Sequence, residues 1–570
     1  MTNATDTPDA GPATPPINAH RAPTPGAPPT TATTLVGHAI GWRVARRRRR
    51  LADTGWWARN TARLQLRQLE GLLSAGSFCR FGRERHFERI LGLPDPIERY
   101  EAFKKAVPIA DWYAFKDGIA EMREQGKRGV LWPGLVTRFA QTSGTTAGDK
   151  FIPVSDEMLR SNYLASLDIF AHLANRGVPA SRIMGGRCLF LGGSSNLDYN
   201  EHGIATGDLS GLVTPLIRWP LSKIYSPGPE IALMSDWPAK IEAMANLTID
   251  QDIRFISGMP SWAMVLIDRV IELARERGRD ASCARDIWPN LEVFVHGGVK
   301  YAPFQPRMSR AFSGDPGTDF PCRQELYPAS ESFIAMQDRT GDAGMRLLTD
   351  IGTFYEFVPL ERIYDDNPEA FPCWAVEKGQ KYCVVMTTNA GLWRYNIGDV
   401  VEFDNIPAAP DGTGGDGPCR LRIVGRHRHF INAFGENLIV EHIEHGVAEA
   451  AKATGVEPGE FTAAPVYPTE TTRSGLELAV ELPEGVPPET LERFRDAFDR
   501  AVKAVNVDYT TKRTDSLGMQ APTLTALPMG TFHRWLDDRG KLGGQHKCPR
   551  CANHREIIEP LIAIARGASV

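Results

Sequence analysis

The amino-acid sequence predicts an α/β protein with a large N-terminal domain and a small α+β domain at the C-terminus. Three observations lead to this prediction. The chain has 570 residues, whereas a single hydrophobic core stops growing at about 250–300 residues. From about residue 135, short apolar runs alternate with helical patterns, as they do in α/β sheets. After about residue 425 the pattern changes to amphipathic helices around an alternating strand.

Nine short apolar runs predict the strands of the first domain. They are 136–141, 188–191, 253–256, 291–295, 324–326, 353–358, 383–388, 399–403 and 421–424. Between two of them, Trp262, Leu266, Val270 and Leu273 recur with helical spacing after Pro260. Pro is well placed at the start of a helix, so this stretch predicts a helix between two strands.

The second domain shows two helical stripes and one strand with alternating burial. The first stripe consists of Ile439, Ile443, Val447 and Ala450, and the second of Leu491, Phe494, Phe498, Val502 and Val505. Between them, 476–482 alternates apolar and polar residues. A small α+β unit of this size is typical of a separate domain.

Composition changes along the chain predict the boundaries. Residues 1–34 are rich in Pro, Ala and Thr and poor in large apolar side chains, so we expect a disordered tail. The large domain is expected at 35–426, a hinge at 427–436 and the small, mobile domain at 437–570. The stretch from Leu51 to Leu72 is expected to be helical.

The overall composition is that of a soluble globular protein. Hydrophobic residues make up 42%, charged residues 24%, and the net charge is −4. No apolar run approaches the roughly 20 residues that span a bilayer, and no secretory signal is evident. The nine Cys are scattered, so we expect reduced thiols and a cytoplasmic location.

Two local features each have two interpretations. Arg46 to Arg50 form a basic run that could bind RNA or an anionic membrane, but the start of a solvated helix is the simpler reading. We therefore expect no nucleic-acid or membrane partner. Cys548 and Cys551 form a C-x-x-C with His546 and His554 nearby. A zinc site needs four ligands, and two ordinary thiols in a loop are favoured.

The first motif with chemical content is Thr142-Ser143-Gly144-Thr145-Thr146-Ala147-Gly148-Asp149-Lys150, directly after a predicted strand. Gly-rich turns direct backbone N–H groups at anions, hydroxyls add donors, and a Lys supplies positive charge. The spacing is not that of a Walker A loop. Alone, the motif is compatible with phosphate binding or with a simple turn.

Two further motifs also lie at predicted strand ends, where open α/β sheets bind ligands. Tyr327-Pro328-Ala329-Ser330-Glu331 offers a ring to stack on a purine and a carboxylate for Mg²⁺. The stretch from Gly391 to Val400 contains Asp399, expected where a strand begins. A carboxylate there can accept both hydroxyls of a ribose. In isolation, a surface turn is the favoured interpretation of the Tyr327 motif, and an Asp in a β-turn is the alternative for Asp399.

The last motifs flank and follow the hinge. Gly425-Arg426 and Gly435-Glu436-Asn437 lie at the domain boundary. A basic, Gly-rich stretch runs from Lys541 through Lys547 to Arg550. A loop of this kind on a small mobile domain can carry a Lys over a bound nucleotide, whereas a solvated loop is the alternative.

Taken together and in this order, the motifs resemble the adenylate-forming enzymes, and within them the Gretchen Hagen family of acyl acid–amido synthetases. The resemblance covers about residues 70–565. It includes Ile287-Trp288-Pro289-Asn290, Gly297-Gly298 and the stretch Lys547-Cys548-Pro549-Arg550-Cys551. The spacing between motifs, more than any one of them, makes a chance match improbable.

This resemblance implies that the enzyme activates a small carboxylic acid with ATP and passes the acyl group to an amine, with an amino acid as the expected acceptor. The implied nucleotide-binding residues are Ser143, Gly144, Thr145, Thr146, Lys150, Tyr327, Ser330, Asp399 and Arg426. Glu331 is implied as the Mg²⁺ ligand, and Lys547 and Glu331 as the catalytic residues.

The chain departs from the family at two positions. Asn437 stands where many relatives have Lys, so either Lys547 or Lys541 supplies that charge or the bound geometry differs. Pro328 stands where small residues are usual. An acyl-CoA ligase of the same superfamily and a non-catalytic nucleotide-binding relative remain open as alternatives. The sequence does not identify the acid.

Overall fold

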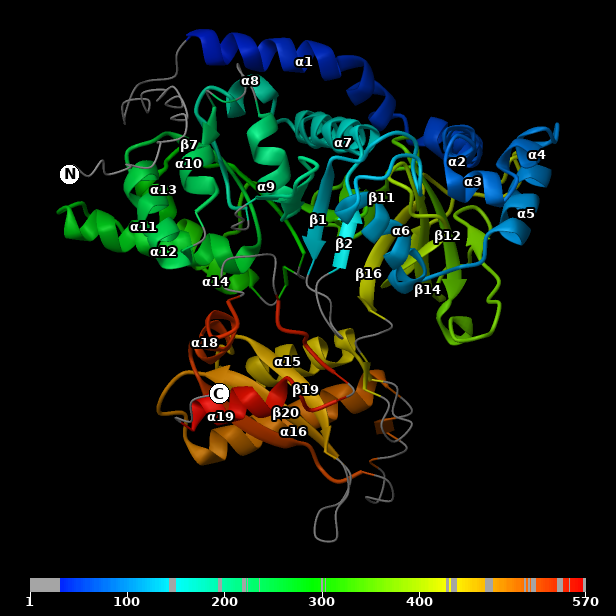
Figure 1. Ribbon diagram of the computed structural model, residues 1–570. Coiled ribbons are helices and arrows are strands. Elements are labelled where there is room, and N and C mark those ends of the chain that lie inside the picture. The colour runs from blue at the N-terminus through cyan, green and yellow to red at the C-terminus, as the bar shows by residue number, and fades with distance from the viewer. Residues whose placement is uncertain are drawn as a thin grey trace, which may run out of the picture.

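The computed structural model divides into a large body formed by residues up to 426 and a small body below it (Figure 1). It describes residues 31–142, 150–192, 197–217, 222, 224–234, 236–298, 301–302, 304–426, 430–431, 438–466, 475–506, 509–510, 513, 519–540, 547–552 and 554–566. No described helix combines the length and apolar character needed to cross a membrane.

The described chain begins with a series of helices on the large body. They are α1 (Thr31–Ala52), α2 (Thr54–Gly76), α3 (Arg80–Glu84), α4 (Phe87–Leu91), α5 (Pro96–Ala106) and α6 (Trp112–Glu124). The predicted helix from Leu51 to Leu72 is therefore broken. Asp53 separates α1 from α2 because its side chain accepts the Trp56 N–H at 2.8 Å and caps α2. Helix α1 also begins at Thr31, within the last four residues of the predicted tail.

A twelve-stranded mixed sheet forms the large body, in the order β13-β12-β14-β15-β16-β11-β10-β9-β8-β7-β3-β6. Strands β6, β3, β7, β8 and β9 run parallel, and the remaining neighbours pair antiparallel. The bounds are β3 (Arg187–Phe190), β6 (Tyr225–Ser226), β7 (Ile253–Ser257), β8 (Val293–Gly297), β9 (Cys322–Pro328), β10 (Phe333–Gln337), β11 (Met345–Leu347), β12 (Thr353–Pro359), β13 (Phe371–Pro372), β14 (Lys381–Thr388), β15 (Tyr395–Asn405) and β16 (Arg420–Arg426). All nine predicted strands of this domain are confirmed, eight of them here.

The ninth, β1, belongs to a second sheet of four strands in the order β2-β1-β5-β4. Its members are β1 (Arg138–Thr142), β2 (Lys150–Pro153), β4 (Asp198–Tyr199) and β5 (Ala205–Gly207). Strands β1 and β5 run parallel, whereas β1 and β2 form an antiparallel hairpin.

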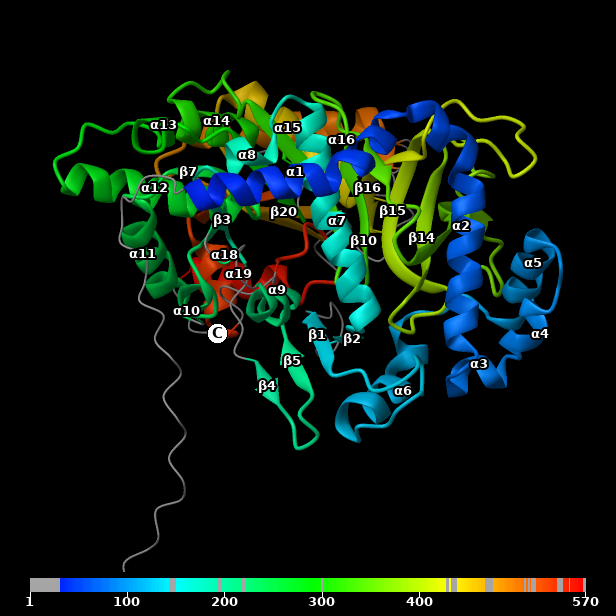
Figure 2. The same ribbon diagram turned by 90° about the horizontal axis from the view of Figure 1, so that it is seen from above.

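Helices cover both faces of the parallel strands. Alternation along β8 decides which face each residue meets: Phe294 packs on α11–α14, while Val293 and Val295 pack beneath α7 and α8. Figure 2 shows α1 lying across α7 and α8 on the outside. The helices are α7 (Asp156–Asn175), α8 (Ala180–Ile183), α9 (Leu209–Val213), α10 (Pro229–Ala232), α11 (Trp237–Thr248), α12 (Pro260–Glu276), α13 (Ala284–Ile287) and α14 (Gln305–Ser313), with short 3-10 turns η1 (Thr214–Leu216) and η3 (Leu360–Arg362).

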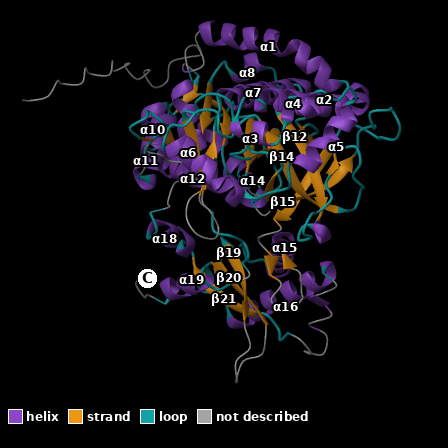
Figure 3. Cartoon of the chain, turned by 45° about the vertical axis from the view of Figure 1, so that its right-hand side comes forward, coloured by secondary structure: helices purple, strands orange, loops and turns teal. Residues whose placement is uncertain are grey.

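The small body is a three-stranded sheet with helices on both faces (Figure 3). The alternation predicted for 476–482 is confirmed: Leu476, Leu478 and Val480 face α15 and α16, while Ala479 faces α18 and α19. The elements are β17 (Phe430–Ile431), β18 (Leu438–Ile439), α15 (Val440–Thr454), β19 (Phe461–Val466), β20 (Gly475–Leu482), α16 (Pro488–Val505), β21 (Thr523–Pro528), α18 (Thr531–Asp537) and α19 (Ile558–Ala565).

The prediction that Arg46–Arg50 lie at the start of a helix is wrong. One member of the run, Arg47, anchors α1 to the rest of the large body. The run lies in the last turns of α1. Arg47 points inward and donates to Asp168 at 2.6 and 2.8 Å and to Asp350 at 2.5 and 2.9 Å. Asp168 is only 2% exposed. The arginine therefore ties α1 to α7 and to the loop before β12.

Replacing Arg47 by Met should destabilise the large domain. Two carboxylates would lose their shared cation, and breaking a buried ion pair costs about 3–5 kcal/mol. We expect a fall in melting temperature of roughly 5 °C or more in a calorimetric scan. Arg46→Met is the matched control, because Arg46 is exposed and surface substitutions usually change stability by less than about 0.5 kcal/mol. Equal melting of both variants would contradict the anchoring role.

Candidate active site

The carboxyl ends of the parallel strands meet at one edge of the large sheet, as required for a ligand site in an open α/β fold. The chain just past two of these strands hydrogen-bonds to the neighbouring strand. The Leu191 N–H after β3 donates to Ser257 O at 2.8 Å, and the Gly258 N–H after β7 donates to Val295 O at 3.0 Å. At Gly297 a Cβ atom would lie 2.6 Å from Leu326 O, so only glycine fits against β9.

Tyr327 and Asp399, predicted from separate motifs, meet at this edge. The Tyr327 hydroxyl donates to Asp399 Oδ2 at 2.6 Å, and both side chains are buried. Asp399 lies four residues inside β15, so the expectation that a strand begins there is wrong. The strand begins at Tyr395 because the antiparallel pairing with β14 already holds at Met386–Tyr395. One carboxylate oxygen is thus oriented by the tyrosine.

Glu331 lies in the turn between β9 and β10, next to Ser330, and both are partly exposed. The Tyr395 hydroxyl donates to Glu331 Oε1 at 3.1 Å. Tyr395 is the first residue of β15, so the third motif orients the carboxylate of the second. Tyr395 is a positioning residue that the sequence reasoning missed; its place in the Gly391–Val400 motif was the available signal.

The predicted phosphate-binding residues Ser143, Gly144, Thr145 and Thr146 lie outside the described residues. The strands on either side define where that segment starts and ends. Thr142 at the end of β1 pairs with Lys150 at the start of β2, so residues 143–149 connect the two strands of a hairpin. Lys150 is partly exposed at the base of this connection.

Arg426 is the last residue of β16 and stands opposite Asp399 in the register of β15 and β16. The backbone of Arg426 therefore lies beside the Tyr327–Asp399 pair. This position is also where the large body ends, ahead of the predicted hinge at 427–436. Asn437 and Lys541, the two positions affected by the family departure, lie outside the described residues.

Lys547 of the small body reaches the same edge of the large sheet. Its ammonium donates to the carbonyl of Gly298, immediately after β8. Strand β8 is the neighbour of β9, and adjacent strands are about 5 Å apart. Two ion pairs also link the bodies: Arg310 with Glu457 at 3.3 Å and Lys381 with Glu441 at 3.9 Å. The predicted catalytic lysine is thus beside Tyr327's strand.

His296 is a buried residue that directly precedes Gly297 and Gly298. Burial, together with the nearby Arg323, lowers the pKa of His296 to about 3. The ring is therefore neutral at physiological pH, and its Nε2 accepts from Arg323 at 3.1 Å. Tyr301 stacks on the ring at 4.7 Å between centroids. A neutral, packed histidine is suited to rigid support of the turn and not to proton transfer.

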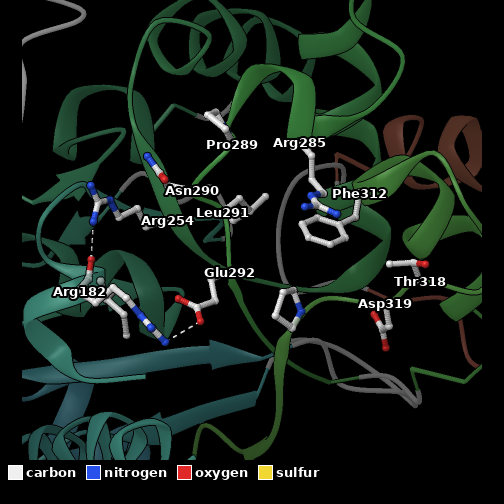
Figure 4. Close-up of a pocket in the computed structure, with 12 residues that line it drawn as sticks. Arg182, Arg254, Arg285, Pro289, Asn290, Leu291, Glu292, Phe312, Thr318 and Asp319 are labelled. Carbon is white, nitrogen blue, oxygen red and sulfur yellow. Dashed lines mark hydrogen bonds and ion pairs between the residues drawn. The ribbon is translucent and has the colours of Figure 1, made fainter. Parts of the chain in front are cut away.

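A cavity of about 350 Å³ lies at the opposite edge of the sheet, where β7, β8 and β9 begin (Figure 4). Two of the arginines that line it already hydrogen-bond to other protein groups. Arg182 donates to Glu292 at 2.7 Å, and Arg254 donates to the backbone carbonyl of Arg182 at 2.8 Å. None of the predicted site residues lines this cavity. It is not the continuation of the candidate active site.

The C-x-x-C pair packs inside the small body. Cys551 belongs to the cluster under α15 and α16, and Cys548 to the cluster under α18 and α19. Burial raises the pKa of both thiols, which disfavours the thiolate form that zinc requires. No cluster of metal-ligating side chains occurs among the described residues. All nine cysteines of the chain are buried, and none forms a disulfide.

The chain is similar to known proteins in both sequence and structure. The GH3 family N-terminal domain matches residues 56–227 and 198–317, the central domain 346–411 and the C-terminal domain 441–556. Among curated proteins, the chain is 22% identical to an indole-3-acetic acid-amido synthetase, GH3.3, of Arabidopsis thaliana, covering 88% of this chain and 91% of that protein.

Two further relatives agree. A jasmonoyl–L-amino acid synthetase, JAR6, of Nicotiana attenuata is 23% identical, covering 81% of this chain and 86% of that protein. The solved structure of the GH3.15 acyl acid amido synthetase superposes with a TM-score of 0.70 at 16% identity, over 89% of this chain and 94% of that one. At this identity the superposition establishes a shared fold.

Tyr395→Phe tests whether the hydroxyl orients Glu331 for a metal. Loss of a group that orients a metal ligand typically weakens metal binding about 10–100-fold. We expect Mg²⁺-dependent ATP binding, measured by calorimetry, to require that much more Mg²⁺. Tyr113→Phe is the control, because Tyr113 is 50% exposed on α6. An unchanged Mg²⁺ titration in Tyr395→Phe would show that Glu331 needs no such support.

Proposed function

The chain belongs to the GH3 family, and on this premise we propose that it activates a small carboxylic acid with ATP and transfers the acyl group to an amine. The observation that carries the proposal is the meeting of Tyr327, Asp399 and Lys547 at one sheet edge. These residues come from three motifs and from both bodies. The relatives named above are amido synthetases of acids, and one is a jasmonoyl–L-amino acid synthetase, which supports an amino acid as the acceptor.

We assign each part of ATP to residues of the motifs. Tyr327 would contact the adenine, while Asp399 accepts the ribose hydroxyls and Arg426 lies beside them. Ser330, Lys150 and the hydroxyls and N–H groups of Ser143, Gly144, Thr145 and Thr146 would bind the phosphates. Backbone N–H groups and a lysine suit that task, since they place positive potential around a polyphosphate.

Glu331 fits a Mg²⁺ ligand, because it is a partly exposed carboxylate that a tyrosine hydroxyl already orients. When bound, Mg²⁺ would spread negative charge off the leaving pyrophosphate. Side chains of the protein would orient the substrates and exclude water. Glu331 and Ser330 would orient the phosphates, and the two domains would exclude water from the reacting groups.

The reaction has two steps. In the first, a carboxylate oxygen of the acid attacks the α-phosphorus, an O–P bond forms, and the bond to the bridging oxygen breaks with release of pyrophosphate. In the second, the amine nitrogen attacks the acyl carbon, the C–O bond to AMP breaks, and a proton leaves the nitrogen. Lys547 would neutralise charge that develops at the α-phosphate. We expect the reaction to take place in the cytoplasm.

Lys150→Ala and Asp399→Ala test the nucleotide site. Each should reduce acid-dependent ATP–pyrophosphate exchange about a hundredfold or more, the scale of a lost charged contact worth about 3 kcal/mol. The two positions come from separate motifs, so a shared effect requires that both contact ATP. Near-normal exchange in either correctly folded variant would remove that residue from the site.

Lys547→Ala tests the role of the small domain. A lysine on a closing domain can serve one half-reaction without serving the other. Acyl-adenylate formation should slow at least about tenfold if a charged contact is lost. Conversion of a supplied acyl-adenylate plus amine to the amide should stay near normal. Loss of both steps to the same extent would indicate a misfolded small domain, and Lys541→Ala would then be the next variant.

The same assay distinguishes the acceptor. Hydroxylamine or an amino acid, but not coenzyme A, should consume the acyl-adenylate. Faster capture by coenzyme A would replace the amide step with thioester formation and leave only the first step standing. An enzyme that binds ATP but shows no exchange with any acid would be a non-catalytic relative.

A further inference from the structure

A buried polar cluster of Asp208, Ser210 and Lys240 lies beside the candidate active site and has no part in the reaction described above. Asp208 directly follows β5 and Ser210 lies in α9, while Lys240 comes from α11. Lys240 is 1% exposed and Asp208 is 7% exposed. Charged side chains are rarely this buried unless they are paired or functional.

Lys240 links two backbone segments by hydrogen bonds. Its ammonium donates to Gly192 O at 3.1 Å and to Ala232 O at 2.7 Å. Gly192 follows β3, and Ala232 is the last residue of α10. Two of the three donor hydrogens of Lys240 are therefore directed at backbone carbonyls and not at Asp208.

Asp208 and Ser210 retain unused hydrogen-bonding capacity. Among the described residues, none is a hydrogen-bond partner of the buried Asp208 Oδ2 or of the buried Ser210 Oγ. Asp208 also makes no side-chain cap to α9. Burial raises the pKa of Asp208 to about 6, an effect that Lys240 partly offsets. At pH 7.5 the group is a carboxylate, and a buried, unsatisfied carboxylate is costly unless a ligand or water supplies donors.

The cluster lies near the end of β1, the first strand of the β1–β2 hairpin. Strand β5 runs parallel to β1, with Gly207 opposite Ala140, so Asp208 follows at the level where β1 leads to residues 143–149. Figure 2 shows α9 at the end of β5, beside β1. A Cβ placed on Gly192 would be 3.2 Å from the Ser210 Cβ. Gly192 thus brings the end of β3 against the cluster.

The distance to the catalytic lysine is short. Strands β3, β7 and β8 are consecutive neighbours, so the ends of β3 and β8 are two strand spacings, about 10 Å, apart. Lys547 contacts Gly298 just after β8. A small molecule can span this distance, and one end of a substrate at the sheet edge can reach Asp208.

We propose that Asp208 and Ser210 bind the ammonium group of the acceptor, a primary amine such as an amino acid. This rests on the proposed function. The unused groups are an anionic acceptor and a hydroxyl, which suit a cation that donates hydrogen bonds. Asp208 repels a carboxylate, so the cluster does not suit the acid substrate. Lys240 holds the walls of this subsite in place.

The test compares Asp208→Asn with wild type in the two half-reactions. Acid-dependent ATP–pyrophosphate exchange should stay within about threefold, because the acceptor takes no part in it. With a supplied acyl-adenylate, the KM for the best of the twenty amino acids should rise about 10–100-fold, the scale of a lost charged hydrogen bond. Hydroxylamine, which is uncharged near pH 7.5, should be captured at the wild-type rate.

Matched variants keep the result interpretable. Ser210→Ala should raise the same KM by about three- to tenfold and covers the case in which Asp208→Asn does not fold. Asp198→Asn changes an exposed carboxylate of the same four-stranded sheet and should change nothing. An unchanged KM for amino acids in both cluster variants overturns the proposal.

Equal loss with hydroxylamine and amino acids also overturns it and makes Asp208 a counter-ion of Lys240 only. Absence of exchange in the wild-type protein with every acid would instead refute the proposed function, so the two failures are distinguishable.

Discussion

The buried ion pair between Arg394 and Glu356 is the interaction on which the candidate site depends. The guanidinium donates to both carboxylate oxygens at 2.9 Å and also to Val107 O at 2.8 Å. Arg394 has a positive φ of 48°, a conformation that costs a non-glycine residue about 1–3 kcal/mol and persists only where surrounding contacts enforce it. Because the pair joins α5, β12 and the turn before β15, it sets where β15 begins.

Two hydroxyl–carboxylate contacts follow from that position. Tyr395 is the next residue after Arg394 and donates to Glu331, and four residues later Asp399 accepts from Tyr327. Both contacts join β15 to the β9–β10 region across the sheet. The site is therefore oriented before a nucleotide arrives, which reduces the ordering cost of binding. The contact between Lys547 and Gly298 adds the small body to this frame.

The sequence was sufficient for the fold class, the predicted strands and the family. Strand prediction worked because buried parallel strands are short continuous apolar runs, and the alternation at 476–482 reports side chains that point to opposite faces of the sheet. It was insufficient for Arg47. A run of five arginines looks the same whether or not one member turns inward, and the partners Asp168 and Asp350 are 121 and 303 residues away.

The sequence by itself predicted the chemistry, because residue types at motif spacing are typical of a nucleotide site, a carboxylate for a metal and a lysine on a small C-terminal domain. Only the tertiary structure decided how these groups are oriented. Tyr327 and Asp399 are 72 residues apart, and Glu331 and Tyr395 are 64 apart. The same holds for Asp208 and Lys240, which belong to different elements. Such pairs arise when strands distant in sequence become neighbours, and no local pattern encodes that pairing.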